Sequence, residues 1–180
     1  MDTTRTRNIT IGTSINHCEK IDKNSNGINE VVKGYDEKNL LLFEHFDEDE
    51  NGIVEHRITY MPNGQPSLEF FYNNDLGKIS KQVIYSYGDV SSTTEFSYNE
   101  NGDIDTKVIY NGRGEKVKES NYSYSLDNKL THVAVDSDGN GDIDFYEDYD
   151  EFGNCTKRSA KSIFEIAFGF LKVLFSSLFS

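Results

Sequence analysis

Side chains that carry oxygen alternate along one short stretch of the chain, residues 136–147. Asp136, Asp138 and Asn140 occupy every second position, and Gly141 follows them directly. The stretch fits the calcium-loop pattern D-x-[DN]-x-[DN]-G-x5-E at every specified position, including Glu147 at the twelfth. Oxygen ligands in this number suit Ca²⁺ far better than Zn²⁺, and the stretch contains no thiol or imidazole. The spacing therefore predicts a calcium site, against the simpler alternative of a polar hairpin turn.

Each position of such a loop has a defined role. The side chains at positions 1, 3 and 5 converge on the ion, and the glycine at position 6 allows the chain to turn sharply around it. Position 7 binds through its main-chain carbonyl, position 9 directly or through water, and position 12 with both carboxylate oxygens. The predicted metal ligands are Asp136, Asp138, Asn140, Asp142, Asp144 and Glu147.

This stretch resembles the loop of an EF-hand, a family in which a helix flanks the loop on each side. The flanking segments here, residues 130–135 and 145–149, are instead rich in β-branched and aromatic residues, which is typical of strands. The resemblance is therefore to an EF-hand loop placed on a β-hairpin, without the exiting helix on which the reach of Glu147 depends. An ion bound there is expected to staple a turn and not to act as a sensor switch.

Three other turns repeat part of the pattern. Each has oxygen-bearing side chains at positions 1, 3 and 5, glycine at position 6 and a carboxylate at position 9, but no ligand at position 12. We expect the turn that starts at Asp47 to bind calcium weakly and the one at Ser97 to be only a turn. The turn at Asp22 is compatible with weak calcium binding and with a simple turn. The weaker candidate ligands are Asp47, Asp49, Asn51 and Glu55, then Asp22, Asn24, Asn26 and Glu30; the turn at Ser97 also contains Asn99, Asn101 and Asp105.

Turn-forming residues recur along the whole chain and define its expected fold. Eleven such turns lie between Asp22 and Tyr149, about 12.7 residues apart. Apolar and polar residues alternate between them, as in residues 67–72 and 81–87, which is typical of strands buried on one face. The sequence predicts a mainly β protein with an antiparallel meander of about twelve strands over residues 8–160, within a single domain spanning 1–180. The sheet is expected to be strongly curved or closed into a barrel.

Several of these turns resemble the Tyr-Asp turn of YD (Rhs-type) repeats. The similar segments are residues 98–102, 110–114 and 149–154, and the resemblance extends over about residues 35–155. The Tyr-Asp pair itself occurs only at 35–36 and 149–150. YD repeats are bacterial β-repeats that build shells around toxin domains, so the resemblance implies a β-hairpin repeat architecture and carries no activity. A tyrosine-rich meander of any origin is the alternative.

The C-terminal segment, residues 162–180, differs from the rest of the chain. Its polar residues recur every three or four positions and form a narrow stripe, while almost all others are large and apolar. This predicts one hydrophobic helix. Because a sheet with one apolar face must bury it, we expect the sheet to pack on or around this helix. Contact with a membrane or a partner is the alternative for residues 162–180.

The charge of the chain restricts its partners. A net charge of −13 makes nucleic acid an unsuitable partner and favours cations or a basic protein. No Sec-type signal follows the N-terminal methionine, so the cytoplasm is the default location, with signal-independent export or membrane association as alternatives. The four histidines are scattered, and no recognised catalytic spacing occurs, so we expect no enzyme.

Three functional hypotheses follow. The first is a non-catalytic, calcium-binding β-repeat protein that acts as an interaction module, in which Ca²⁺ staples a turn. The second is an acidic immunity or inhibitor protein that masks a toxin or another basic partner. The third is a membrane-associated protein that uses residues 162–180.

Overall fold

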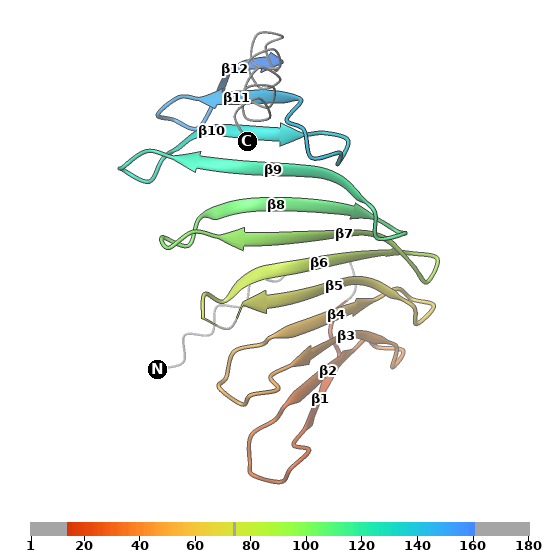
Figure 1. Ribbon diagram of the computed structural model, residues 1–180. Helices are drawn as coiled ribbons and strands as arrows, with labels where there is room; N and C mark the ends of the chain where they lie inside the picture. The colour runs from red at the N-terminus through yellow and green to blue at the C-terminus, as the bar shows by residue number, and fades with distance from the viewer. Residues whose placement is uncertain (1–13, 74, 161–180) are drawn as a thin grey trace, which may run out of the picture. The chain divides into compact units, whose positions relative to one another are not determined.

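The computed structural model describes residues 14–73 and 75–160, and all regular secondary structure among them is β. Twelve antiparallel strands follow one another in the order of the chain (Figure 1). Each predicted turn falls between two consecutive strands. The predicted antiparallel meander of about twelve strands is therefore confirmed.

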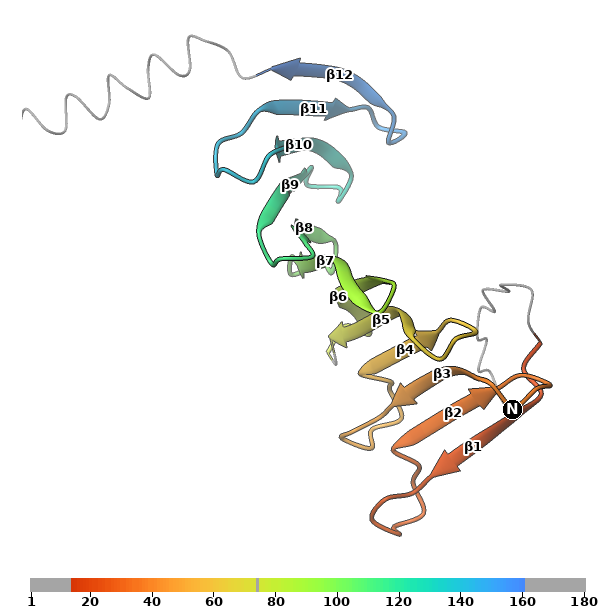
Figure 2. The same cartoon turned by 90° about the vertical axis from the view of Figure 1, so that its right-hand side faces the viewer.

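The chain divides into two compact units, residues 1–89 and 90–180. The first unit contains β1 (His17–Ile21), β2 (Val31–Tyr35), β3 (Leu41–Phe46), β4 (His56–Tyr60), β5 (Pro66–Asn73) and β6 (Lys78–Ser86). The second contains β7 (Asp89–Tyr98), β8 (Ile104–Asn111), β9 (Lys116–Tyr124), β10 (Leu130–Asp136), β11 (Phe145–Tyr149) and β12 (Cys155–Ala160). Within each unit the described strands form a single layer (Figure 2), in which a strand contacts only its neighbours along the chain.

Six connections are the same five-residue turn, and a tyrosine precedes each of them. At the turn that starts at Asp150, the Asp150 N–H donates to Asn154 O and the Gly153 N–H donates to Asp150 O, both at 3.0 Å. The fourth residue has a positive φ, 82° at Gly153. This combination matches a type I turn followed by a left-handed residue and a bulge. The six turns start at Asp36, Met61, Asn99, Asn111, Ser125 and Asp150.

Cross-strand pairs of polar and aromatic side chains hold the first unit together. The Tyr35 hydroxyl donates to Glu19 at 3.0 Å and the Tyr85 hydroxyl donates to Glu69 at 2.6 Å, each from a position 16 residues further along the chain. Burial and the hydrogen bond to Glu69 raise the pKa of Tyr85 to about 12, so its phenol stays a proton donor. The His56 ring also stacks on the Phe71 ring, with 4.4 Å between centroids. Such pairs are the unit of stabilisation in a sheet.

The predicted fold is wrong in two respects. The described strands form an open sheet and not a barrel, and the described residues contain no helix on or around which the sheet could pack. The helix predicted for residues 162–180 lies outside the described residues. The alternation of apolar and polar residues along the strands predicted one buried face. Only four hydrophobic residues of the described part are buried. Side chains on both faces of the sheet instead pair with their neighbours. No helix in the described part is long and apolar enough to cross a membrane.

The left-handed position of the tyrosine turn gives a first prediction. At Gly64 the φ is 79° and an added Cβ would meet nothing within 4 Å, so a side chain there adds backbone strain and no clash. Gly64→Ala should lower the free energy of unfolding by about 1 kcal/mol, measured by urea denaturation. Asn39→Gly is the matched control, since Asn39 holds the same position with φ 62° and glycine relieves it. An equal loss of stability in both variants would contradict this account.

Candidate metal centre

Three connections are longer than the tyrosine turns and share one backbone conformation. They are the first loop (residues 22–30, between β1 and β2), the second loop (47–55, between β3 and β4) and the third loop (136–144, between β10 and β11). In each, the residues at positions 4 and 6 have positive φ. The position-4 residues are Ser25, Glu50 and Gly139, with φ of 63°, 61° and 78°; the position-6 residues are Gly27, Gly52 and Gly141, with φ of 93°, 86° and 95°.

The three loops also share one hydrogen-bond scheme. The position-1 aspartate accepts the N–H of the position-6 glycine at 2.7, 3.0 and 2.9 Å in the first, second and third loops. The position-9 carboxylate accepts the position-2 N–H at 2.7, 2.6 and 2.7 Å. The position-5 asparagine oxygen accepts the position-7 N–H at 2.8, 2.7 and 2.7 Å. This scheme brings the side chains of positions 1, 3 and 9 toward the centre of the loop.

The conformation that the three loops share is therefore nine residues long, and a repeat in the sequence indicates it for the first two. The first and second loops lie 25 residues apart, as Asp22 and Asp47 show, and the same spacing relates Glu30 to Glu55. The tyrosine–glutamate pairs on the strands follow the same period. A search for internal repeats at about twice the turn spacing would have shown that these two loops are equivalent.

The second loop contains the clearest candidate centre. Asp47, Asp49 and Glu55 each place a carboxylate oxygen within 4.8 Å of the others. Asp47 Oδ1 and Glu55 Oε1 are buried and accept no hydrogen bond. A buried carboxylate oxygen without a partner is costly, and a bound cation would remove that cost. Sequence reasoning ranked this loop below the third one, because spacing alone does not show which oxygens are satisfied.

The third loop clusters Asp136, Asp138 and Asp144 in the same way, again within 4.8 Å. Asp136 is the most buried of these side chains, at 1% exposed. Its carboxylate accepts N–H groups from Gly139 and Gly141 at 2.8 and 2.9 Å, and the Lys116 ammonium lies 3.4 Å from Oδ2. Burial by itself raises the pKa of Asp136, but these hydrogen bonds and the ammonium outweigh it and hold the pKa below its usual value.

Glu147, the ligand predicted at position 12, is not part of this cluster. It lies on β11, where its Oε1 accepts a hydrogen bond from Arg158 Nε at 2.9 Å and its Oε2 accepts one from the Tyr149 hydroxyl at 2.9 Å. The hydrogen bond from Arg158 is the main reason that the pKa of Glu147 is lowered. A strand leaves the loop in place of a helix, so the position-12 side chain becomes a cross-strand partner of β12.

The other predicted loops are placed as follows. The first loop has carboxylates only at Asp22 and Glu30, and the amides of its two asparagines donate to Glu50 of the second loop. The turn at Ser97 is one of the short tyrosine turns, in which Asn99 Oδ1 accepts the N–H of Asn101 at 3.0 Å. Within the second unit, this turn and the third loop lie at opposite ends of the strands (Figure 1).

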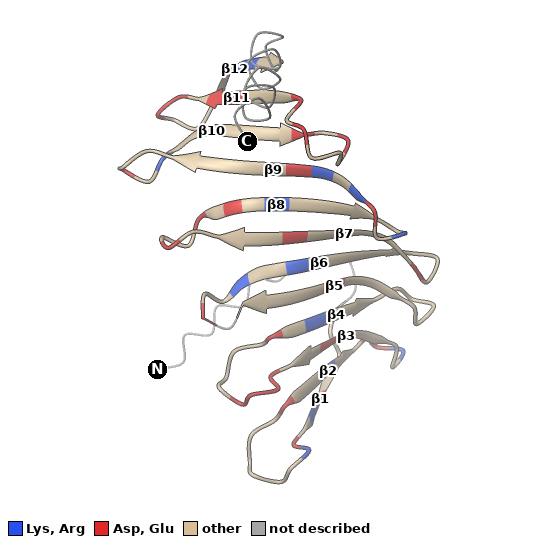
Figure 3. Cartoon of the chain, in the orientation of Figure 1, with Lys and Arg blue, Asp and Glu red and all other residues tan. Residues whose placement is uncertain are grey.

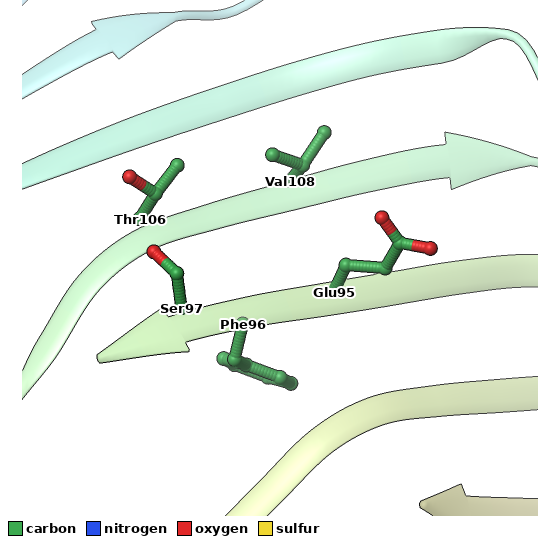
Figure 4. A pocket seen from close by; sticks show the side chains of 5 residues that line it. All are labelled: Glu95, Phe96, Ser97, Thr106 and Val108. Atoms are coloured by element: carbon green, nitrogen blue, oxygen red, sulfur yellow. The ribbon is translucent and has the colours of Figure 1, made fainter. Parts of the chain in front are cut away.

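Little other chemistry is assembled in the described part of the chain. A shallow hollow on β7 and β8 is lined by Glu95, Phe96, Ser97, Thr106 and Val108, so its lining offers one carboxylate and two hydroxyls but no histidine, lysine or cysteine (Figure 4). Two histidine–carboxylate pairs occur, but their rings stack on aromatic neighbours of the sheet. Burial lowers the pKa of His45 to about 4, so this side chain is neutral at pH 7.

Comparisons with known proteins add little to this geometry. No family model matches the sequence, and no curated protein matches it. Solved structures with a similar region include accessory secretory protein 1, 2 and 3 in Streptococcus pneumoniae (TM-score 0.38, 13% identity, 61% of this chain and 21% of that chain). The GtfA/B complex bound to UDP and GlcNAc is similar at TM-score 0.38 and 16% identity, over 61% of this chain and 22% of that one. TarM is similar at TM-score 0.25 and 8% identity, over 69% of this chain and 22% of that one. The chain thus spans about a fifth of the solved chains it matches, and likenesses this weak carry no argument.

The lowered pKa of Asp136 gives a second prediction. A carboxyl group with a lowered folded-state pKa adds stability above its unfolded pKa of about 3.9, and this stability is lost as the pH falls through the folded-state value. Between pH 5 and pH 2, the wild type should therefore lose more unfolding free energy than Asp136→Asn, measured by urea denaturation without calcium. Asp138→Asn removes an exposed carboxylate from the same loop and is the control for the loss of one charge. Equal pH profiles for wild type and Asp136→Asn would contradict the assignment.

Proposed function

We propose that this protein is a non-catalytic calcium-binding module in which ions held by long hairpin loops fix the loops on an open β-sheet. The observation that carries the proposal is the pair of buried, unpartnered carboxylate oxygens in the second loop, Asp47 Oδ1 and Glu55 Oε1. Three carboxylates within 4.8 Å repel one another, so the loop is destabilised without a cation. A divalent cation at their centre would convert this repulsion into attraction.

The proposed donor sets consist of oxygen only. In the second loop they are Asp47, Asp49, Asn51 and Glu55, and in the third they are Asp136, Asp138, Asn140 and Asp144, each with the main-chain carbonyl at position 7. Carboxylate, amide and carbonyl oxygens are the ligands that Ca²⁺ prefers, whereas Zn²⁺ favours nitrogen and sulfur. Without a position-12 ligand, water is left to complete the coordination, which favours a weaker site than that of an EF-hand sensor.

The sheet around the loops suits an interaction module. In Figure 3 the ribbon is coloured for acidic residues mainly at hairpin connections, whereas most basic residues lie along strands. Ions that neutralise the loops would leave the single-layer strands as the binding surface, and the partner we propose is another protein. Masking of a basic protein by the acidic chain is the competing function, and it requires no calcium.

Calcium should raise the thermal stability of the protein. A ligand that binds only the folded state stabilises it by mass action, by about 2.7 kcal/mol at a hundredfold excess over Kd. We predict a higher Tm in Ca²⁺ than in EDTA for the wild type. The increase should be smaller for Glu55→Gln, which replaces a charged second-loop ligand by a neutral side chain of nearly the same shape. Glu48→Gln removes an exposed charge from the same loop and serves as the control. Identical melts in Ca²⁺ and EDTA would remove the basis of the proposal and leave the masking function.

The ammonium of Lys116 should weaken the third loop, because it lies 3.4 Å from Asp136 Oδ2 and competes with a cation there. Lys116→Met should tighten calcium binding at this loop severalfold, measured by calorimetric titration. Lys118→Met, on the same strand but without contact to Asp136, is the control for net charge. A variant that binds no more tightly than the Lys118→Met protein would show that Asp136 is not a calcium ligand.

A further inference from the structure

We propose that the first loop is an additional calcium site and that Glu50 couples its occupancy to that of the second loop. This inference rests on the proposed function, which assigns calcium to the second and third loops. The first loop has only two carboxylates of its own, Asp22 and Glu30, and its ligating positions 3 and 5 carry amides. Its affinity for Ca²⁺ therefore depends on how well those amides are oriented.

Glu50 orients both amides from the neighbouring loop. Its side chain crosses from position 4 of the second loop, and its two oxygens accept hydrogen bonds from Asn24 Nδ2 and Asn26 Nδ2. The oxygen of each amide is fixed at the same time, because Asn24 Oδ1 accepts the Asn26 N–H at 3.0 Å and Asn26 Oδ1 accepts the Ile28 N–H at 2.8 Å. Each amide nitrogen is thus held by the second loop, while its oxygen stays with the backbone of the first.

A backbone hydrogen bond joins the ligand positions of the two loops directly. The Asp47 N–H, at position 1 of the second loop, donates at 2.9 Å to the carbonyl of Glu30, at position 9 of the first. Glu30 is only 6% exposed, and its carboxylate accepts the Lys23 N–H at 2.7 Å. Any adjustment of Asp47 toward an ion is therefore transmitted to the residue that closes the first loop.

These contacts give a physical reason for positive cooperativity. An ion in the second loop would fix Asp49 and Asn51, the two residues that flank Glu50, and so restrain the Glu50 carboxylate. The first loop would then bind with its amides already oriented, and the ordering cost would have been met by the first ion. The third loop provides an internal comparison, because its position 4 is Gly139, which has no side chain to reach another loop.

Each loop contains its own reporter for a titration. The N–H groups of Gly27, Gly52 and Gly141 donate to the position-1 aspartates of their own loops, at 2.7, 3.0 and 2.9 Å. Binding of Ca²⁺ to an aspartate should change the chemical shift of the glycine that it accepts from. A titration of the full chain with Ca²⁺, followed by ¹⁵N–¹H correlation spectra, therefore gives a separate midpoint for each loop.

The test compares three variants with the wild type. In Asp47→Asn and in Glu50→Gln, the Gly27 midpoint should move to at least about fivefold higher calcium, the lower range of measured allosteric couplings. In Glu48→Gln, which removes the same charge without touching the first loop, that midpoint should stay. The Gly141 midpoint should stay in all three variants, because the third loop belongs to the second unit. Unchanged resonances of the first-unit strands, which contain none of the three substitutions, show that each variant has folded.

Reciprocity separates coupling from local damage. Coupling free energies are equal in both directions, so Asp22→Asn should move the Gly52 midpoint by the same factor by which Asp47→Asn moves that of Gly27. The coupling is overturned if the Gly27 resonance of the wild type does not respond to calcium while those of Gly52 and Gly141 do. It is also overturned if Gly27 responds but its midpoint is unchanged in Asp47→Asn and Glu50→Gln. If none of the three glycines responds, calcium binding itself is wrong.

Discussion

One interaction organises each long loop: an aspartate carboxylate accepts the N–H of a glycine five residues later. It closes the first, second and third loops at 2.7, 3.0 and 2.9 Å and requires the left-handed glycine that all three contain. Because the same carboxylate starts the loop and lies at its centre, closing the turn also gathers the acidic side chains. The metal centre that we propose is thus a consequence of how the hairpin turns, and an ion would reinforce a geometry that hydrogen bonds already define.

The sheet that holds these loops has almost no apolar core. Four hydrophobic residues of the described part are buried, namely Val31, Val83, Val133 and Val135. Stability therefore depends on turns and on side-chain pairs between neighbouring strands, such as the ion pair of Lys33 and Glu44 at 2.9 Å. In a single layer of this kind each hairpin is supported only by its neighbours, so restraints at the turns have more influence than in a packed domain. Ions in three loops would act where the fold has few other contacts.

Local features of the sequence were the ones that could be predicted. Glycine and asparagine at left-handed positions define the turns, so the number and order of strands followed from residues such as Gly64 and Gly153. The ligand spacing in the third loop was equally local. The closed barrel was wrong because alternation does not distinguish a face that needs cover from one whose side chains pair across the sheet. Glu147 was assigned from a pattern that assumes an exiting helix. The unpartnered oxygens of Asp47 and Glu55 depend on how the folded loop places its hydrogen-bond donors, which spacing in the sequence does not show.

If the long loops are specific calcium sites, they bind the ion in a fixed ratio to the chain. Equilibrium dialysis of the purified protein against labelled Ca²⁺, at a constant background of Mg²⁺ and salt, tests this ratio most directly. We expect saturable binding of at least two ions per chain, with one ion fewer in Asp49→Ala, which removes a second-loop ligand. Calcium uptake that rises without saturation, or that salt displaces as it would from any acidic surface, would contradict specific binding at the loops.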